Sequence, residues 1–235
     1  MTDKPAVIYM GGLQMTGDWL GRGPKAEFLR AQCESAGVKF IPLDWQSKQD
    51  GTMGQWVDTT RHSLHKLHVN NELQKPSVLV ASSIGVWVAL AALAHMGAGA
   101  EQYVQHLVAV GPVIDATLPL AKHFDSAPDL KIPVPCGDNV QPFLLSKHHV
   151  DDAAWYLITP GTSNTLSRIS LKIGATFLAG ADDMGNAQYL AGFFNALRDC
   201  RTRPTPLNAG HYANDDDDNS MIWRAIIDAQ KTRSA

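Results

Sequence analysis

Ser83, Asp183 and His211 are residues of the types used in nucleophilic catalysis, and each follows a predicted strand, although the strand before His211 is the weakest prediction. A serine hydroxyl becomes an effective nucleophile when a histidine takes its proton and a carboxylate orients that histidine. The set therefore predicts acyl transfer, with Ser83 as nucleophile, His211 as general base and Asp183 as the orienting carboxylate.

Two adjacent serines, Ser82 and Ser83, compete for the position of the nucleophile. They stand where a strand-like run changes into an alanine-rich helical run. A serine on such a strained turn needs small residues two positions before and after it, so that the backbones can pass. Ser83 has Ala81 and Gly85 there, whereas Ser82 would have two β-branched residues. The spacing therefore selects Ser83, although the pattern A-S-S-I-G lacks one glycine of the usual G-x-S-x-G.

The three candidate residues come together if the chain forms a parallel sheet, because parallel strands deliver their C-terminal ends to one edge. Asp183 follows the run 175–179, and His211 lies in P-L-N-A-G-H-Y before the last helical run. Asp182 is the alternative orienting residue. Unrelated surface positions for all three are the alternative interpretation of the set.

Hydrolysis by such a set also needs N–H donors for the negative oxygen that develops during attack. The amide of Ile84 is the first expected donor, since it starts the helix after Ser83 and the helix dipole favours an anion there. The second is expected from the loop after the first strand, with Leu13 preferred and Gly12 next, because glycines let this loop turn its amides inward. A plain Gly-Gly turn is the alternative.

Strand-like and helical runs alternate along the chain, which predicts an α/β fold with a mostly parallel sheet of about six strands. The expected strands are 6–10, 39–43, 77–81, 106–110, 175–179 and 202–207. The expected helices are 25–36, 53–67, 84–95, 187–198 and 220–231. A single domain over 1–235 fits this length and the 45% hydrophobic content.

The segment 112–170 departs from this alternation, because prolines interrupt it repeatedly. Long segments of this kind inside a domain tend to be lids or binding loops. Its scattered apolar residues are the expected substrate contacts: Phe143, Leu144, Trp155 and Tyr156. An irregular packing segment without ligand contact is the alternative.

Nine histidines are present, and three of them, His62, His65 and His68, recur at helical spacing. A solvated helix face explains these three most simply, although the nearby Asp58 and Glu72 leave a weak surface metal site open. The sequence contains no recognised metal-ligand signature. No metal is therefore expected.

Composition argues against several other classes of protein. A net charge of -3, without a block rich in Lys and Arg, gives no basic field for nucleic acid or anionic lipid. No run approaches the roughly 20 apolar residues that span a membrane, and the first apolar segment is too short for a signal peptide. The three cysteines, Cys33, Cys136 and Cys200, are too widely spaced for a disulfide framework. A cytoplasmic protein that binds neither nucleic acid nor membrane is expected.

On these residues, the chain resembles the α/β-hydrolase superfamily over nearly its whole length, and the order Ser, Asp, His is the one expected of that fold. A closer likeness is to the group containing the mitochondrial acyl-glucuronide esterase and palmitoyl-protein thioesterase, with the elbow Gly-Ser-Ser-Leu-Gly-Gly-Trp. The matching residues here are Ala81, Ser82, Ser83, Ile84, Gly85, Val86 and Trp87. Other likenesses are the loop Gly11-Gly12-Leu13, the strand end Pro42-Leu43-Asp44-Trp45 and the helix start Met53-Gly54-Gln55-Trp56.

The resemblance implies an α/β-hydrolase fold with a lid-like insertion and esterase or thioesterase chemistry on a small-molecule substrate, without metal or organic cofactor. We expect the sheet to lack the antiparallel hairpin that many relatives place first, since few residues precede Ala6. A catalytically silent hydrolase-fold binding protein and a carbon-carbon bond hydrolase with the same triad are the alternatives. The oligomeric state is left open.

The four adjacent aspartates 215–218 have no counterpart in that resemblance. Neighbouring carboxylates repel one another and normally stay in water. We therefore expect a solvated loop here, with cation binding or repulsion of anionic substrates as the alternatives.

Overall fold

The computed structural model describes residues 5–13, 20–46, 51–73, 77–136, 141–158, 173–180, 203–207 and 216–231. A six-stranded sheet lies at the centre, in the order β2-β1-β3-β4-β7-β8, and its pairings are parallel. Its strands are β1 (Val7–Met10), β2 (Phe40–Pro42), β3 (Ser77–Ser82), β4 (Val104–Val110), β7 (Gly174–Gly180) and β8 (Arg203–Leu207). The mostly parallel sheet predicted from the sequence is confirmed.

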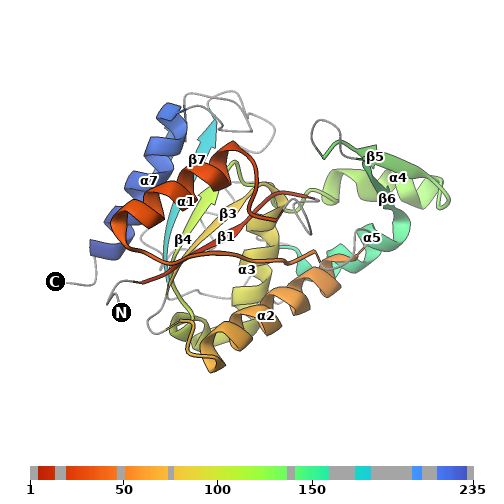
Figure 1. Ribbon diagram of the computed structural model, residues 1–235. Helices are drawn as coiled ribbons and strands as arrows, with labels where there is room; N and C mark the ends of the chain where they lie inside the picture. The colour runs from red at the N-terminus through yellow and green to blue at the C-terminus, as the bar shows by residue number, and fades with distance from the viewer. Residues whose placement is uncertain are drawn as a thin grey trace.

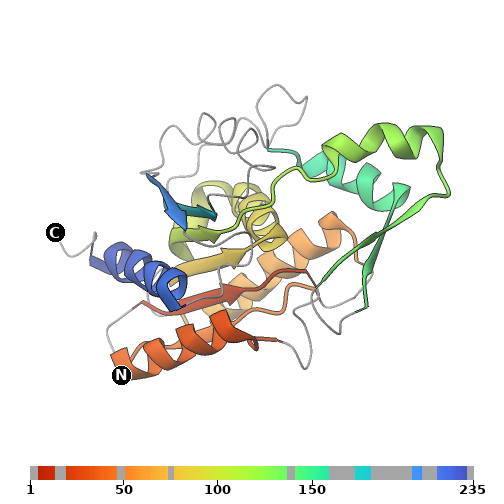
Figure 2. The same ribbon diagram turned by 90° about the horizontal axis from the view of Figure 1, so that it is seen from above.

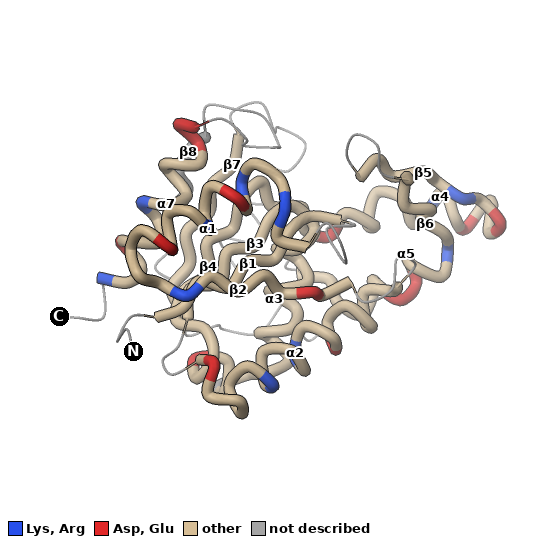
Figure 3. Tube along the Cα trace, in the orientation of Figure 1, with Lys and Arg blue, Asp and Glu red and all other residues tan. Residues whose placement is uncertain are grey.

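Apolar side chains point to both faces of the central strands, as a sheet covered on both sides requires. In β1, Val7 and Tyr9 pack into one apolar cluster, whereas Ile8 and Met10 pack into another on the opposite face. The traces of β1, β3 and β4 carry no Lys, Arg, Asp or Glu (Figure 3). These strands therefore form an uncharged, mostly apolar core, and polar groups can be placed at their C-terminal ends.

Two layers of helices cover this core (Figures 1 and 2). Residues of α1 (Pro24–Ala36) and α7 (Asp216–Lys231) pack on the face that carries Val7 and Tyr9. Residues of α2 (Met53–Val69) and α3 (Ile84–Met96) pack on the face that carries Ile8 and Met10. Because α3 is buried from Gly85 to Ala94, it forms the centre of this second layer.

The segment predicted as a lid follows β4 and projects from the sheet on the side where β1 and β3 end (Figure 2). It contains α4 (Ala121–Ser126), β5 (Lys131–Val134), β6 (Phe143–Ser146) and α5 (Lys147–Ala153), with short 3₁₀ turns at Leu118–Leu120 and Ala154–Tyr156. Strands β5 and β6 pair antiparallel. We use the name lid for the described residues of this segment, 112–136 and 141–158, and its role as a lid stays a prediction.

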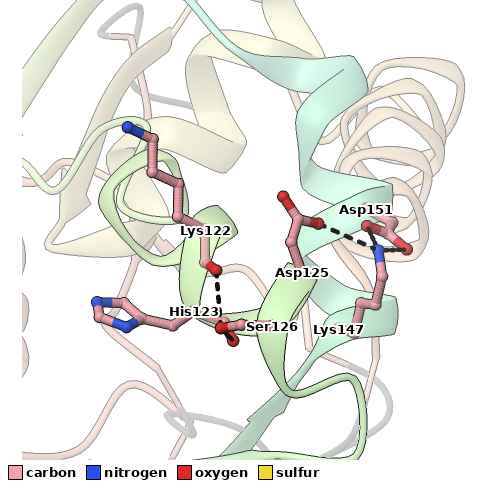
Figure 4. Close-up of polar contacts among 6 residues, drawn as sticks. All are labelled: Lys122, His123, Asp125, Ser126, Lys147 and Asp151. Atoms are coloured by element: carbon pink, nitrogen blue, oxygen red, sulfur yellow. Dashed lines mark hydrogen bonds and ion pairs between the residues drawn. The ribbon is translucent and has the colours of Figure 1, made fainter.

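Polar contacts join the two helices of the lid to each other (Figure 4). Lys147 of α5 contacts Asp151 on its own helix, with Nζ to Oδ distances of 2.6 and 2.8 Å, and approaches Asp125 of α4 at 4.0 Å. The Ser126 hydroxyl donates to the carbonyls of Lys122 and His123 at the end of α4. These groups are exposed, so the contacts hold the shape of the lid weakly.

Buried or half-buried contacts tie the two ends of the lid to each other and fasten it to α2 and α3. Both carboxylate oxygens of the fully buried Asp115 accept from the Ile158 N–H, at 2.9 and 3.1 Å. The Trp87 indole of α3 donates to the Tyr156 carbonyl at 2.8 Å. Asp152 accepts from the Gly54 N–H at the start of α2 at 2.7 Å. The two ends of the lid are therefore tied together and to both helices of one layer.

The boundaries of some elements differ from the sequence prediction. The last helix begins at Asp216, earlier than the predicted start at residue 220, because the acidic residues form its first turn, where the helix dipole favours them. The 3₁₀ helix Gly97–Gln102 was not predicted. The predicted helix 187–198 lies outside the described residues.

Candidate active site

Ser83 forms the turn between β3 and α3, and its backbone adopts a conformation that side chains rarely take. Its φ is 56° and its ψ is -131°, a combination that costs a residue with a side chain about 1–3 kcal/mol. The Ser83 N–H donates to the Val110 carbonyl at 3.0 Å, and the Ser83 carbonyl accepts from the Val113 N–H at 3.2 Å. A strained serine held at a strand-to-helix turn is the geometry that the sequence pattern predicts.

The neighbouring Ser82 is directed into the interior. Its hydroxyl accepts a hydrogen bond from the buried Lys25 Nζ at 3.2 Å. Ser82 is itself buried, whereas Ser83 is half-buried. The two serines therefore have different surroundings, and Ser82 has a structural partner in the layer of α1.

The small residues that flank Ser83 are required by close backbone contacts. A Cβ added to Gly85 would lie only 2.6 Å from the Gly11 carbonyl oxygen. Ala81, fully buried, pairs with Met10 at the end of β1. The first turn of α3 thus rests directly on the backbone that follows β1, and this contact leaves no room for a side chain at position 85.

The loop after β1, predicted to supply an N–H donor, lies next to Ser83. A Cβ built on Gly12 would be 3.5 Å from the Ser83 Cβ. Leu13 is half-buried and packs against the apolar cluster of the α2 and α3 layer, as does Ile84. Gly12 and Ile84 thus lie next to the serine, and the role of these two residues and of Leu13 as an oxyanion hole stays a prediction.

Asp183, its rival Asp182, and His211 lie outside the described residues. The strands that precede them are described: β7 ends at Gly180 and β8 at Leu207. Both run parallel to β3 in the same sheet. The chain therefore leaves these strands at the edge that carries Ser83, which is the placement the triad prediction needs.

The four predicted substrate contacts have unequal surroundings. Phe143 is buried and packs against Trp56, with ring centroids 5.7 Å apart. Tyr156 is half-buried beside α2 and α3, and burial raises the pKa of its hydroxyl. Leu144 is 51% exposed and Trp155 is 76% exposed on the surface of the lid. Substrate contact by any of the four stays a prediction.

Lys25 carries no signal in the sequence pattern, yet it is buried, as is Asp218, in the layer of α1 and α7. Burial lowers the pKa of Lys25 to about 8, and the Asp218 carboxylate opposes that shift. Asp218 is 0% exposed, whereas Asp216 and Asp217 are exposed. For Asp218 the expectation of a solvated loop is therefore wrong, because a cation from α1 compensates its charge.

Of the three histidines at helical spacing on α2, two fit the interpretation as a surface face, whereas His68 is half-buried with its ring 5.0 Å from that of Tyr103. His62 and His65 are exposed, and the His65 ring nitrogen lies 3.3 Å from the Tyr103 hydroxyl. Among the residues that the structure describes, no group of three or more His, Cys, Asp or Glu side chains could hold a metal ion. His106 is a different case, since burial lowers its pKa to about 4 and its Nε2 lies 2.8 Å from the Thr176 hydroxyl.

None of the helices in the described ranges combines the length and the apolar character needed to cross a bilayer.

No protein-family model and no curated protein matches the chain. Solved structures do match it. A protein from Agrobacterium vitis is 19% identical with a TM-score of 0.74, over 97% of this chain and 88% of that one. The mouse alpha/beta hydrolase domain-containing protein 10 is 16% identical with a TM-score of 0.71, over 97% and 90%. This chain has the α/β-hydrolase fold. A Paleococcus ferrophilus monoacylglycerol lipase shares that fold at 12% identity and a TM-score of 0.65, over 97% and 96%.

Proposed function

We propose that this protein is a serine hydrolase that cleaves carboxylic esters or thioesters through an acyl-enzyme on Ser83. The observation that carries the proposal is the strained backbone of Ser83 at the β3–α3 turn, with φ 56° and ψ -131°. Strain of this kind persists where the surrounding structure enforces it and is concentrated at functional sites. An α/β-hydrolase fold places a nucleophile at this turn, and monoacylglycerol lipase activity in a structural neighbour agrees with the proposal.

In the proposed mechanism the Ser83 hydroxyl attacks the carbonyl carbon while His211 takes its proton. Asp183 orients the histidine, with Asp182 as the alternative. The N–H groups of Ile84 and of Leu13 or Gly12 stabilise the oxyanion, and donors of this kind each contribute on the order of 10²–10³ in rate. As the C–O or C–S bond breaks, the protonated His211 gives its proton to the departing oxygen or sulfur, and the neutral histidine later activates the water that releases the acyl group. No metal ion or organic cofactor takes part in this sequence.

The lid is proposed to bind the acyl group of the substrate, and this group is expected to be apolar and of modest size. The argument comes from the apolar side of β6, where Phe143 and Leu145 are buried. Apolar walls of this kind line most small-molecule sites. The elbow's likeness to the group of the acyl-glucuronide esterase and palmitoyl-protein thioesterase favours the same bond types.

The sharpest test compares alanine substitutions at the two serines. Ser83→Ala should lose on the order of 10⁶ in kcat, as expected when the nucleophile of a triad is removed. Ser82→Ala removes only the acceptor of Lys25 and should keep most of the activity. Hydrolysis of p-nitrophenyl esters is the measurement, and a dead Ser82→Ala with an active Ser83→Ala would contradict the assignment of Ser83 as nucleophile.

A fluorophosphonate probe separates an enzyme from a silent binding protein, since only an activated serine forms the adduct. Mass spectrometry should locate the adduct on Ser83, and its absence on folded protein would favour the binding alternative.

A series of esters of increasing chain length, compared with acyl-CoA substrates, then separates ester from thioester hydrolysis. Cleavage of a diketone, without ester cleavage, would favour the carbon-carbon hydrolase. For an ester hydrolase, activity should rise with pH through a histidine titration near about 6–7, because only neutral imidazole accepts the proton.

A further inference from the structure

The buried indole of Trp45 is hydrogen-bonded to the backbone that lies beside Ser83. Trp45 is 1% exposed, and its Nε1 donates to the Gly11 carbonyl at 3.2 Å. It follows β2, where the Leu43 N–H still pairs with the Tyr9 carbonyl at 2.8 Å. The sheet therefore fixes where Trp45 stands, and Trp45 in turn holds Gly11.

The same carbonyl oxygen is confined by the first turn of α3. The Gly85 Cα approaches it so closely that an added Cβ would lie 2.6 Å away. The Gly11 oxygen thus lies against the indole N–H and also against the helix that begins after Ser83.

Fixing this carbonyl also fixes the amide of the next residue. A peptide unit is planar and trans, so the Gly12 N–H points opposite to the Gly11 C=O. Two consecutive glycines have wide conformational freedom, and without an external contact their peptide units could rotate. A Cβ built on Gly12 would lie 3.5 Å from the Ser83 Cβ. Rotation of the Gly11–Gly12 peptide unit would therefore redirect an N–H group that lies close to the serine.

We propose that Trp45 is a positioning residue that holds the oxyanion-hole loop Gly11–Leu13 in its working conformation. The inference rests on the proposed serine-hydrolase function and assigns to Trp45 a role in it. Trp45 does not touch the reacting atoms and acts through the Gly11 carbonyl. Its ring meets that of Trp56 edge-on, with centroids 5.5 Å apart.

Trp45 and Trp56 form a matched pair for the test. Both are buried, they contact each other, and the indole nitrogen of Trp56 has no hydrogen-bond partner among the described residues. Both substitutions replace an indole by the smaller phenyl ring. Trp45→Phe also removes the hydrogen bond to the Gly11 carbonyl, whereas Trp56→Phe removes no hydrogen bond to a described residue. Differences between the two variants therefore report on the hydrogen bond.

Trp45→Phe should lower kcat for p-nitrophenyl esters by about 10- to 100-fold with little change in KM, since a misplaced donor acts mainly on the transition state. Trp56→Phe should stay within about threefold of the wild type. A phenylboronic acid, which forms a tetrahedral adduct with an active serine, should bind Trp45→Phe more weakly by a similar factor. Thermal unfolding of both variants shows whether they fold equally well.

Equal kcat and boronate affinity in the two variants would overturn the role of Trp45 while the proposed function stands. A wild-type protein inert to esters and to fluorophosphonate would overturn the proposed function and this inference with it. If Trp45→Phe does not fold, 3-benzothienylalanine at position 45 provides the same test, because it keeps the fused ring and lacks the N–H. Full activity of that variant would also overturn the proposal.

Discussion

The two faces of the sheet support the elbow with different kinds of polar contact. On the face of α2 and α3, neutral indole N–H groups donate to backbone carbonyls, from Trp45 to Gly11 and from Trp87 to Tyr156. On the face of α1 and α7, the contact to the elbow comes from the buried Lys25, which donates to Ser82. One face therefore uses neutral hydrogen bonds, and the other uses a buried charge.

The difference determines how each face responds to pH and to substitution. A neutral hydrogen bond contributes about 0.5–1.5 kcal/mol to stability, at any pH where its groups do not titrate. A buried ammonium is expensive to desolvate and depends on a partner of opposite charge. Because burial lowers the pKa of Lys25 to about 8, its charge changes within an accessible pH range. The contacts on the α1 and α7 face should therefore be stronger individually and more sensitive to pH.

The largest expected effect comes from removing the charge of Asp218. Asp218→Asn removes the carboxylate that favours the charged form of the buried Lys25. Because the pKa of Lys25 is already about 8, the lysine can lose its proton instead, so the expected loss at pH 7 is about 1–2 kcal/mol. Asp217→Asn, in the same first turn of α7 but exposed, should change stability by less than about 0.5 kcal/mol. Urea unfolding at pH 7, followed by tryptophan fluorescence, measures both.

The loss caused by Asp218→Asn should also shrink at pH 9.5, where Lys25 is largely neutral in the folded state. Equal losses in Asp218→Asn and Asp217→Asn would show that Asp218 does not compensate Lys25, and the contrast between the two faces would then fail.

Lys25→Met tests the pH response directly. In the folded protein Lys25 loses its proton near pH 8, but in the unfolded chain only near 10.5. Between these values the unfolded state binds more protons, so the contribution of Lys25 to stability rises with pH, by up to about 1.4 kcal/mol per pH unit. The wild type should therefore gain stability relative to Lys25→Met between pH 8 and about 9.5.

The difference between the two proteins is the quantity to measure, because other groups titrate nearby. Burial raises the pKa of Cys33 on α1 and of Tyr9 on β1 to about 12, which lowers stability at high pH in both proteins alike. The Lys25→Met substitution also takes the cation away from Asp218, so the slope with pH, rather than the stability at one pH, carries the result. Parallel curves for the two proteins would contradict a buried ammonium at position 25.

The sequence predicts the fold well because local patterns carry it. Alternating apolar runs specify the strands and helices, and the need for a small residue at position 85 follows from the spacing around Ser83 alone. The structure shows why a small residue is needed: Gly85 lies in close contact with the Gly11 carbonyl.

Contacts between distant residues were not predictable in the same way. Repulsion among adjacent aspartates predicts a solvated loop, and only the fold reveals that Lys25 lies beside Asp218. Proline-rich sequence also concealed the β5–β6 pair, in which Pro133 stands opposite Leu144, since a two-stranded ribbon has free edges that tolerate proline. Asp183 and His211 lie outside the described residues, so their roles stay predictions from order and spacing.

The smallest expected effect tests the neutral contacts of the α2 and α3 face. Trp87→Phe removes the indole that donates to the Tyr156 carbonyl at 2.8 Å, while Trp56→Phe removes a buried indole without a hydrogen-bond partner among the described residues. Trp87→Phe should therefore lower the free energy of unfolding by about 1 kcal/mol more than Trp56→Phe does.

This difference should not depend on pH. Burial lowers the pKa of His95, whose ring packs against Tyr156, so this histidine is neutral above pH 7.5. The difference should then stay constant from pH 7.5 to 9.5, whereas a difference that follows pH as in Lys25→Met would show that this face, too, depends on a buried charge.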